Sequence, residues 1–185
     1  LLPGSRKQEI QNLLPEMLKA AEKIVTVKPD VQFYLPIAST IPQSMVMNII
    51  EKYSIKVNLT HDKNYDLMSI ADVGIASSGT VTLEAAILNL PTVVIYKLAF
   101  LTYLLGKMLV KIPYFSLPNI IVGRKLIPEL LQNQANYNNI AKETIKILEN
   151  SAKMKQEMKI VTERLGQGGA VKKVAKLILS YTKNC

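Results

Sequence analysis

The stretch LPGSRKQE (residues 2–9) carries the first side chains in this sequence that are suited to chemistry. After an apolar pair the chain turns at Gly4, and Ser5 and Arg6 follow where a helix is predicted to begin. Backbone N–H groups at a helix start carry partial positive charge, and an arginine beside them can bond phosphate oxygens through its planar fork. The alternative, which this stretch alone favours, is a turn with a serine cap and a solvent-facing arginine.

A second stretch, SSGTVTLE (residues 77–84), has a similar design. Ser78, Gly79 and Thr80 stand between an apolar segment and a helical one, and Glu84 follows one helical turn after Thr80. Glycine lets a ligand approach the backbone closely, threonine can bond a phosphate, and a carboxylate can accept hydrogen bonds from both hydroxyls of a ribose. The alternative is a carboxylate that only stabilises the helix dipole, by about 0.3–1 kcal/mol. We call residues 2–9 the first hinge and residues 77–84 the second hinge.

Other patterns of catalytic or metal-binding residues are weaker. Neither hinge matches GxGxxG or GxxxxGK[ST], and Ser78 lacks the GxSxG pattern of a hydrolase elbow. His61 is the only histidine and Cys185 the only cysteine, so neither a histidine-based nor a cysteine-based metal cluster is expected. The single cysteine also excludes an internal disulfide and fits a reducing compartment.

The elements around the hinges alternate between strand and helix. Buried strands are predicted over 31–38, 55–60, 72–77 and 91–97, and helices over 10–24, 42–53, 64–71 and 80–89. Pro15 is expected to kink or split the first helix. This alternation indicates right-handed βαβ units, so the predicted fold class is a doubly wound parallel α/β sheet. Ligands of such sheets bind at the carboxyl ends of the strands, where both hinges lie.

Beyond residue 100 the pattern becomes mainly helical. A helical run to about residue 110 and an irregular segment are followed by predicted helices near 126–133, 137–149, 152–165 and 170–182. The last two are amphipathic and are separated by GQGG. The longest apolar stretch, residues 98–106, is far shorter than the ~20 residues that a membrane span requires.

The net charge of +9 lies almost entirely in the second half of the chain. Residues 1–92 contain 8 Lys/Arg and 9 Asp/Glu, whereas residues 93–185 contain 15 and 5. This asymmetry favours an anionic partner, either nucleic acid or a membrane leaflet, although lysines that only solvate helix faces explain most of it equally well. Nucleic acid is disfavoured because the basic residues are scattered and no RNA- or zinc-finger-type motif is present.

Together, LPGSR, SSGTVTLE and SLPNIIVGR (residues 116–124) resemble the carboxyl-terminal half of the lipid A disaccharide synthases, glycosyltransferases with the two-domain GT-B fold. The resemblance covers essentially the whole chain. It implies a Rossmann-like domain at residues 1–150 that binds the donor UDP-2,3-diacylglucosamine, followed by carboxyl-terminal helices at 151–185 that pack toward an amino-terminal domain. Since the chain opens on Leu1-Leu2 without a Met, we expect it to be a piece of a longer protein, inactive by itself.

The resemblance also implies roles for the hinge residues. Arg6, with Gly4 and Ser5 in the same turn, would neutralise the diphosphate as UDP leaves. Ser78, Gly79 and Thr80 would contact the same diphosphate, Glu84 would face the ribose, and Asn119 would line the donor pocket. The loop from His61 to Tyr65 would lie near uracil. No cofactor and no essential metal are expected, and the general base would come from the amino-terminal domain.

The implied reaction is an inverting transfer of 2,3-diacylglucosamine to 2,3-diacylglucosamine 1-phosphate, giving lipid A disaccharide 1-phosphate and UDP. Such an enzyme would act in the cytoplasm at the inner leaflet of the inner membrane of a Gram-negative bacterium. An apolar patch in residues 98–115, rimmed by Lys107 and Lys111, would contact the anionic lipid; a core helix is the stronger alternative for this segment. A homo-oligomer is compatible with this assignment. The main alternative function is the donor domain of another UDP-sugar GT-B transferase acting on a lipid-linked acceptor, and a third is a non-catalytic interaction domain.

Overall fold

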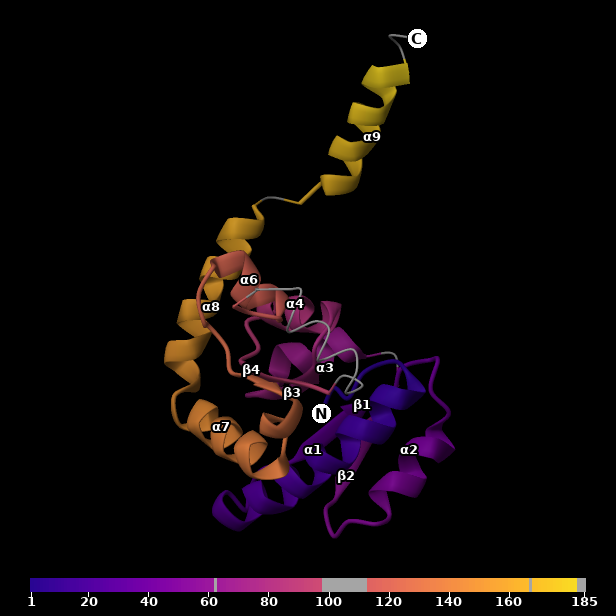
Figure 1. Cartoon of the computed structure of the whole chain (residues 1–185), viewed down its shortest axis with the longest axis vertical. Coiled ribbons are helices and arrows are strands. Elements are labelled where there is room, and N and C mark those ends of the chain that lie inside the picture. Colours follow the sequence, from indigo (N-terminus) through magenta and orange to yellow (C-terminus); the bar gives the residue numbers. More distant parts are fainter. Residues whose placement is uncertain (62, 98–112, 167, 183–185) are drawn as a thin grey trace.

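The computed structural model describes residues 1–61, 63–97, 113–166 and 168–182. In these ranges strands and helices alternate as far as β4, and helices dominate afterwards (Figure 1). The strands are β1 (Phe33–Pro36), β2 (Val57–Thr60), β3 (Gly74–Ser77), β4 (Thr92–Tyr96) and β5 (Glu129–Leu131). The helices are α1 (Lys7–Val27), α2 (Gln43–Ile50), α3 (Asn64–Ile70), α4 (Thr80–Ile87), α6 (Leu117–Val122), the 3₁₀ turn η1 (Gln132–Gln134), α7 (Tyr137–Glu149), α8 (Ser151–Leu165) and α9 (Ala170–Thr182).

All strand pairs in the described residues are parallel. β1 pairs with β2, and β3, β4 and β5 form a second sheet in that order. Leu1 and Leu2 lie between these sheets: the Leu1 nitrogen donates to the Tyr34 carbonyl of β1 at 2.6 Å, and Leu2 bridges to Ala76 of β3 in parallel. The spatial order is therefore β2, β1, Leu1-Leu2, β3, β4, β5, which is the order of the doubly wound dinucleotide-binding fold. The predicted fold class is confirmed.

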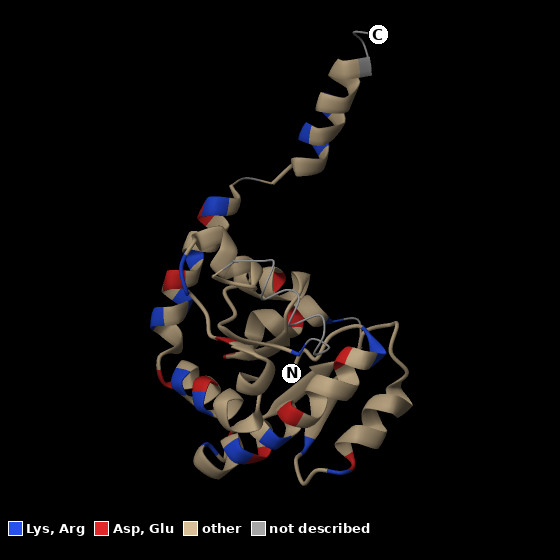
Figure 2. Ribbon diagram, in the orientation of Figure 1, with Lys and Arg blue, Asp and Glu red and all other residues tan. Residues whose placement is uncertain are grey.

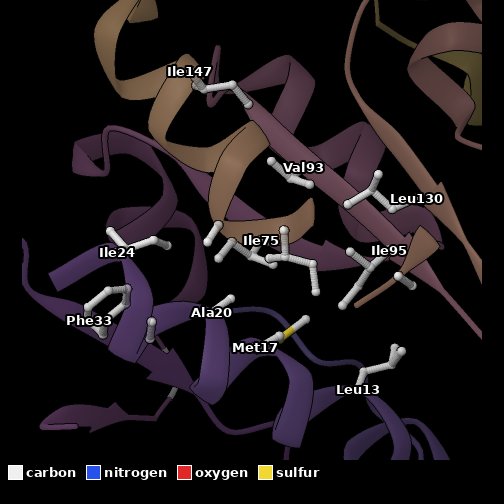
Figure 3. Packing of buried hydrophobic residues seen from close by; sticks show 14 residues of the cluster. Leu13, Met17, Ala20, Ile24, Phe33, Ile75, Val93, Ile95, Leu130 and Ile147 are labelled. Atoms are coloured by element: carbon white, nitrogen blue, oxygen red, sulfur yellow. The ribbon is translucent and has the colours of Figure 1, made fainter. Parts of the chain in front are cut away.

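Helices cover both faces of the sheet because successive strand residues point to opposite sides. On one face Ile75, Val93 and Ile95 pack with residues of α1 and α7, as Figure 3 shows. On the other face Val94 packs with α4, α6 and α8, while Leu2 and Ala76 pack with α3 and α4. Leu2 is therefore buried beside β3, in the middle of the sheet.

Several predicted elements differ from the structure. Pro15 does not split the first helix, since α1 runs from Lys7 to Val27 with Leu14 and Met17 fully buried on either side of it. The helix predicted near 126–133 is wrong: this segment holds β5 and η1, because it pairs with β4. The helix α6 lies in the segment predicted to be irregular, and the helical run predicted to end near residue 110 lies outside the described residues.

The two last helices have different surroundings. α8 buries Met158 and Val161 against α4 and α6, and Arg164 donates to the Ile121 and Val122 carbonyls at 3.0 and 2.8 Å. α9 extends away from the rest of the chain (Figure 1), and its apolar side chains are exposed: Val171 is 85% exposed and Ile178 is 58% exposed. The amphipathic pattern of α8 therefore serves the core of this domain, whereas that of α9 does not.

Candidate functional site

The fold brings the two hinges side by side. The Leu2 nitrogen donates to the Ile75 carbonyl, and the Ser77 nitrogen donates to the Leu2 carbonyl, each at 2.8 Å. The first hinge leaves the sheet just after Leu2, and the second hinge leaves it just after Ser77. The strand order reverses between these neighbours, since α1 leads to β1 on one side while β3 and β4 lie on the other. This is the switch point at which doubly wound folds hold their ligands.

The second hinge is open at this edge. Gly79 and Thr80 are exposed, and within the described residues their backbone N–H groups have no acceptor. A Cβ added to Gly79 would meet no atom of the described residues within 4 Å, so this part of the fold lets a ligand approach the backbone here. The Glu84 carboxylate, half-buried on α4, likewise has no hydrogen bond or ion pair in the part of the chain that the structure describes. Donors, free space and an available carboxylate are therefore combined at one helix start.

The first hinge is occupied by its own carboxylate. Glu9 Oε2 accepts hydrogen bonds from the Ser5 and Arg6 nitrogens at 3.2 and 3.3 Å, and Arg6 Nη1 lies 3.2 Å from Glu9 Oε1. Gly4 has φ +113°, and a Cβ there would overlap the Glu9 side chain, so only glycine fits. The Arg6 side chain is 79% exposed and Glu9 is 18% exposed. The arginine is thus accessible to a ligand, but its charge is already paired.

The backbone just before the segment SLPNIIVGR (residues 116–124) contacts the second hinge. Ser78 Oγ donates to the Phe115 carbonyl at 3.3 Å, directly before α6 begins. Asn119 is fully buried in α6: its Oδ1 accepts from the Leu126 and Ile127 nitrogens, and its Nδ2 donates to the Ile127 carbonyl and to Glu129. Its amide is therefore fully engaged within the protein, which favours a role in shaping the site over direct contact with a ligand.

The loop from His61 to Tyr65 is less closely connected to the hinges. His61 follows β2, the outermost strand, and Tyr65 in the first turn of α3 is 60% exposed. α3 reaches the sheet near the hinges through Met68, which packs with Leu2 and Ala76. Among the described residues no three His, Cys, Asp or Glu side chains gather as a metal site would require, and none of the helices there is long and apolar enough to span a bilayer.

A large cavity of about 550 Å³ lies at the opposite edge of the sheet. Its lining includes Lys28, Phe33, Val73 and Gly74, which belong to the amino ends of β1 and β3 or precede these strands. In that region no described strand pairs between β1 and β3. This cavity fills the gap between the two sheets, and its lining also includes Pro36 at the end of β1 and Leu2 of the first hinge, so it extends toward the edge that carries the hinges.

The strand order and the two helix starts at the switch point define a Rossmann-like α/β domain of the kind found as the carboxyl-terminal domain of GT-B transferases. The family model described as lipid-A-disaccharide synthetase matches residues 1–179. Lipid-A-disaccharide synthases of Nitrosococcus oceani and Geobacter sulfurreducens are 39% and 38% identical over 97% of the chain, and that of Trichlorobacter lovleyi is 40% identical over 99%. The chain belongs to the lipid-A-disaccharide synthase family. It spans about half the length of these relatives, 47–49%.

Two carboxylates near the hinges are missing from the sequence-based site. Glu9 lies within the first hinge, in the first turn of the predicted helix, where a glutamate side chain can turn back to the backbone N–H groups at the helix start. The sequence does not indicate Glu129 as a site residue, because IPELL resembles the start of a helix, with proline ahead of an acid and two leucines. Only the pairing of Glu129 with β4 reveals it as a strand residue.

Proposed function

We propose that this chain is the donor-binding half of an enzyme that transfers 2,3-diacylglucosamine from its UDP derivative to 2,3-diacylglucosamine 1-phosphate. The observation that carries the proposal is the open second hinge at the switch point, in a chain of this family. Among the described residues, the N–H groups of Gly79 and Thr80 and the carboxylate of Glu84 have no partner. In this proposal the diphosphate contacts Ser78, Gly79 and Thr80, and the ribose hydroxyls donate to Glu84. Gly4, Ser5 and Arg6 approach the diphosphate from the neighbouring hinge.

The chemistry that this geometry supports is departure of an anionic leaving group. As the bond between the anomeric carbon and the diphosphate oxygen breaks, a bond forms between that carbon and the 6-hydroxyl of the acceptor, and negative charge develops on UDP. The Arg6 guanidinium and the dipole of α4 are fixed positive groups that stabilise this charge. The proton of the hydroxyl goes to a general base that we assign to the other half of the enzyme. No metal ion is needed in this scheme.

Calorimetry of the chain with UDP, with and without magnesium, tests the proposal. We expect UDP to bind, with an affinity that magnesium leaves unchanged, because fixed cationic groups take the place of the ion. Absence of UDP binding would contradict the nucleotide site. Binding that requires magnesium would contradict the metal-independent scheme while leaving the nucleotide assignment in place.

We further propose that the chain consists of a Rossmann-like domain at 1–150 and carboxyl-terminal helices at 151–185 that pack toward the amino-terminal domain of the enzyme. α8 packs on α4 and α6, so the part with exposed apolar residues suited to packing toward another domain is α9. The placement of the loop from His61 to Tyr65 near uracil also belongs to this proposal: Tyr65 is exposed at the start of α3, where an aromatic ring can stack on a base. Loss of UDP affinity in Tyr65→Ala with unchanged pyrophosphate affinity is the expected result.

A membrane contact is the third part of the proposal. The enzyme would work at the inner leaflet of a Gram-negative inner membrane, on acylated substrates. Many Lys and Arg residues of the basic second half lie on α7, α8 and α9. Figure 2 shows them spread along these helices and alternating with acidic residues on α7 and α8. Residues 98–112 of the apolar segment, which include Lys107 and Lys111, lie outside the described residues. Sedimentation with anionic vesicles should fall with salt and with Lys107→Glu/Lys111→Glu; binding indifferent to both would contradict the contact.

A further inference from the structure

We infer that Glu129 is a positioning residue of the donor site, a proposal that rests on the function proposed above. Glu129 opens β5, and its carboxylate faces the turn that leads into α6. It touches none of the residues assigned to the diphosphate or the ribose. Its effect on the nucleotide passes through the segment 115–119 and then through Ser78.

The first step of the argument is the number of donors that converge on this one carboxylate. Oε1 accepts from the Ser116 nitrogen at 2.8 Å, from Ser116 Oγ at 2.5 Å and from Asn119 Nδ2 at 2.9 Å. The Phe115 nitrogen lies 3.3 Å from Oε1 and 3.2 Å from Oε2. Hydrogen bonds to an ionised acceptor are roughly twice as strong as neutral ones. The carboxylate therefore fixes the turn through three donors of Phe115 and Ser116, and it fixes α6 through the Asn119 side chain.

The second step is the burial of these partners. Ser116 and Asn119 are fully buried, so their donors have no water to replace Glu129 if its acceptor is lost. Asn119 also accepts hydrogen bonds from the Leu126 and Ile127 nitrogens, which ties the first turn of α6 to the residues that lead into β5. The motif SLPN and the acid ten residues beyond it are therefore a single hydrogen-bonded unit.

The third step links this unit to the second hinge. With Phe115 held through its nitrogen by Glu129, its carbonyl accepts from Ser78 Oγ at 3.3 Å. Ser78 immediately precedes the open N–H groups of Gly79 and Thr80. A site whose donors are fixed before the ligand arrives loses less conformational entropy on binding, and Glu129 supplies that fixation here.

Glu129→Gln tests the inference because it keeps the shape of the side chain but removes the charge and one acceptor. The matched control is Glu143→Gln, which removes an equivalent carboxylate from the exposed Glu143–Lys146 pair on α7. We expect the Phe115 and Ser116 amides to exchange about tenfold faster in unliganded Glu129→Gln. We expect the UDP dissociation constant to rise about 5- to 10-fold, with both quantities unchanged in the control.

The outcomes separate the alternatives. Unchanged exchange at Phe115 and Ser116, or faster exchange with unchanged UDP affinity, would overturn the positioning role. Failure of the unmodified chain to bind UDP would overturn the proposed nucleotide function. In that case the exchange rates of the Phe115 and Ser116 amides alone would decide whether Glu129 anchors this turn. If Glu129→Gln does not fold, Ser116→Ala removes only the hydroxyl bond and should shift both quantities in the same direction by less; no shift in either would overturn the inference.

Discussion

The two hinges share a design and differ in what their acids do. Each joins a strand-like segment to a helix through glycine and a hydroxyl residue, and each places a glutamate in the early turns of the helix. In the first hinge Glu9 turns back on Ser5 and Arg6 and satisfies them. In the second hinge Glu84 has no partner among the described residues. One hinge is thus self-neutralised, and the other is open to an external partner.

The glycines make the same distinction. Gly4 is required by the fold, because its φ of +113° and its contact with Glu9 exclude a side chain. Gly79 has no such constraint from the residues that the structure describes, since none of their atoms lies near a Cβ added there and its backbone is extended. A residue type that is shared by two similar motifs is therefore required by the fold in one of them, and in the other it has the open surroundings that the proposed ligand site needs.

Arg6→Ala is expected to have the largest effect, because we propose that the Arg6 guanidinium stabilises the charge that develops on UDP. The substitution tests whether the first hinge acts on the leaving group although Arg6 is paired with Glu9. In the complete enzyme the turnover number should fall about 10²–10³-fold with the protein folded. Arg6→Lys should recover only part of it, because an ammonium lacks the planar fork. Steady-state kinetics with a melting control measures this, and unchanged turnover would confine the chemistry to the second hinge.

Glu84→Gln tests the open acid. We expect UDP affinity to fall by about 1.5–3 kcal/mol, since a charged acceptor for the ribose hydroxyls is lost. Pyrophosphate, which has no ribose, should bind with unchanged affinity. Calorimetry with both ligands measures the difference, and equal losses would remove the ribose role.

Alanine substitutions of Gly4 and Gly79 compare the two hinges through the free energy of unfolding and through UDP binding. Gly4→Ala should lower the free energy of unfolding by about 1–3 kcal/mol, because the residue is forced into a strained backbone region against Glu9. Gly79→Ala should change stability by less than about 0.5 kcal/mol and weaken UDP binding instead, because the new methyl group occupies the space left for the ligand. Urea unfolding and calorimetry on both variants give the two numbers. If Gly79→Ala binds UDP normally, the diphosphate does not lie against this backbone.

Glu9→Gln is expected to have the smallest effect. The Arg6–Glu9 pair is exposed on the arginine side, so its loss should cost about 0–1 kcal/mol of stability. Freed from this partner, Arg6 should hold the diphosphate more strongly, and UDP affinity should rise a few-fold, on the order of 0.5–1 kcal/mol. Weaker UDP binding in this variant would show that Glu9 orients Arg6 rather than competing for it.

Local patterns predicted much of this domain correctly. The apolar stripe of α1, the alternation as far as β4 and the boundaries of α7 and α9 follow from periodicity and turn residues alone. The failures lie between residues 113 and 134, where α6 was missed and β5 was predicted as a helix. β5 has three residues, and its extended form depends on the bonds that β4 offers, which no local pattern contains.

The sequence by itself determined where the candidate site lies, because glycine, hydroxyl and charged residues at the ends of strand-like segments occupy the edge where parallel strands end. It also determined the candidate residues in both hinges and in SLPN. Only the tertiary structure decided which of them have free bonding capacity. The Asn119 side chain already makes hydrogen bonds with Leu126, Ile127 and Glu129. Arg6 is paired with Glu9. Thr80 and Glu84, by contrast, have no partner within the described residues. The reason is physical: a hydrogen-bonding group is available only when the rest of the fold leaves it without a partner, and those partners come from segments far apart in the chain.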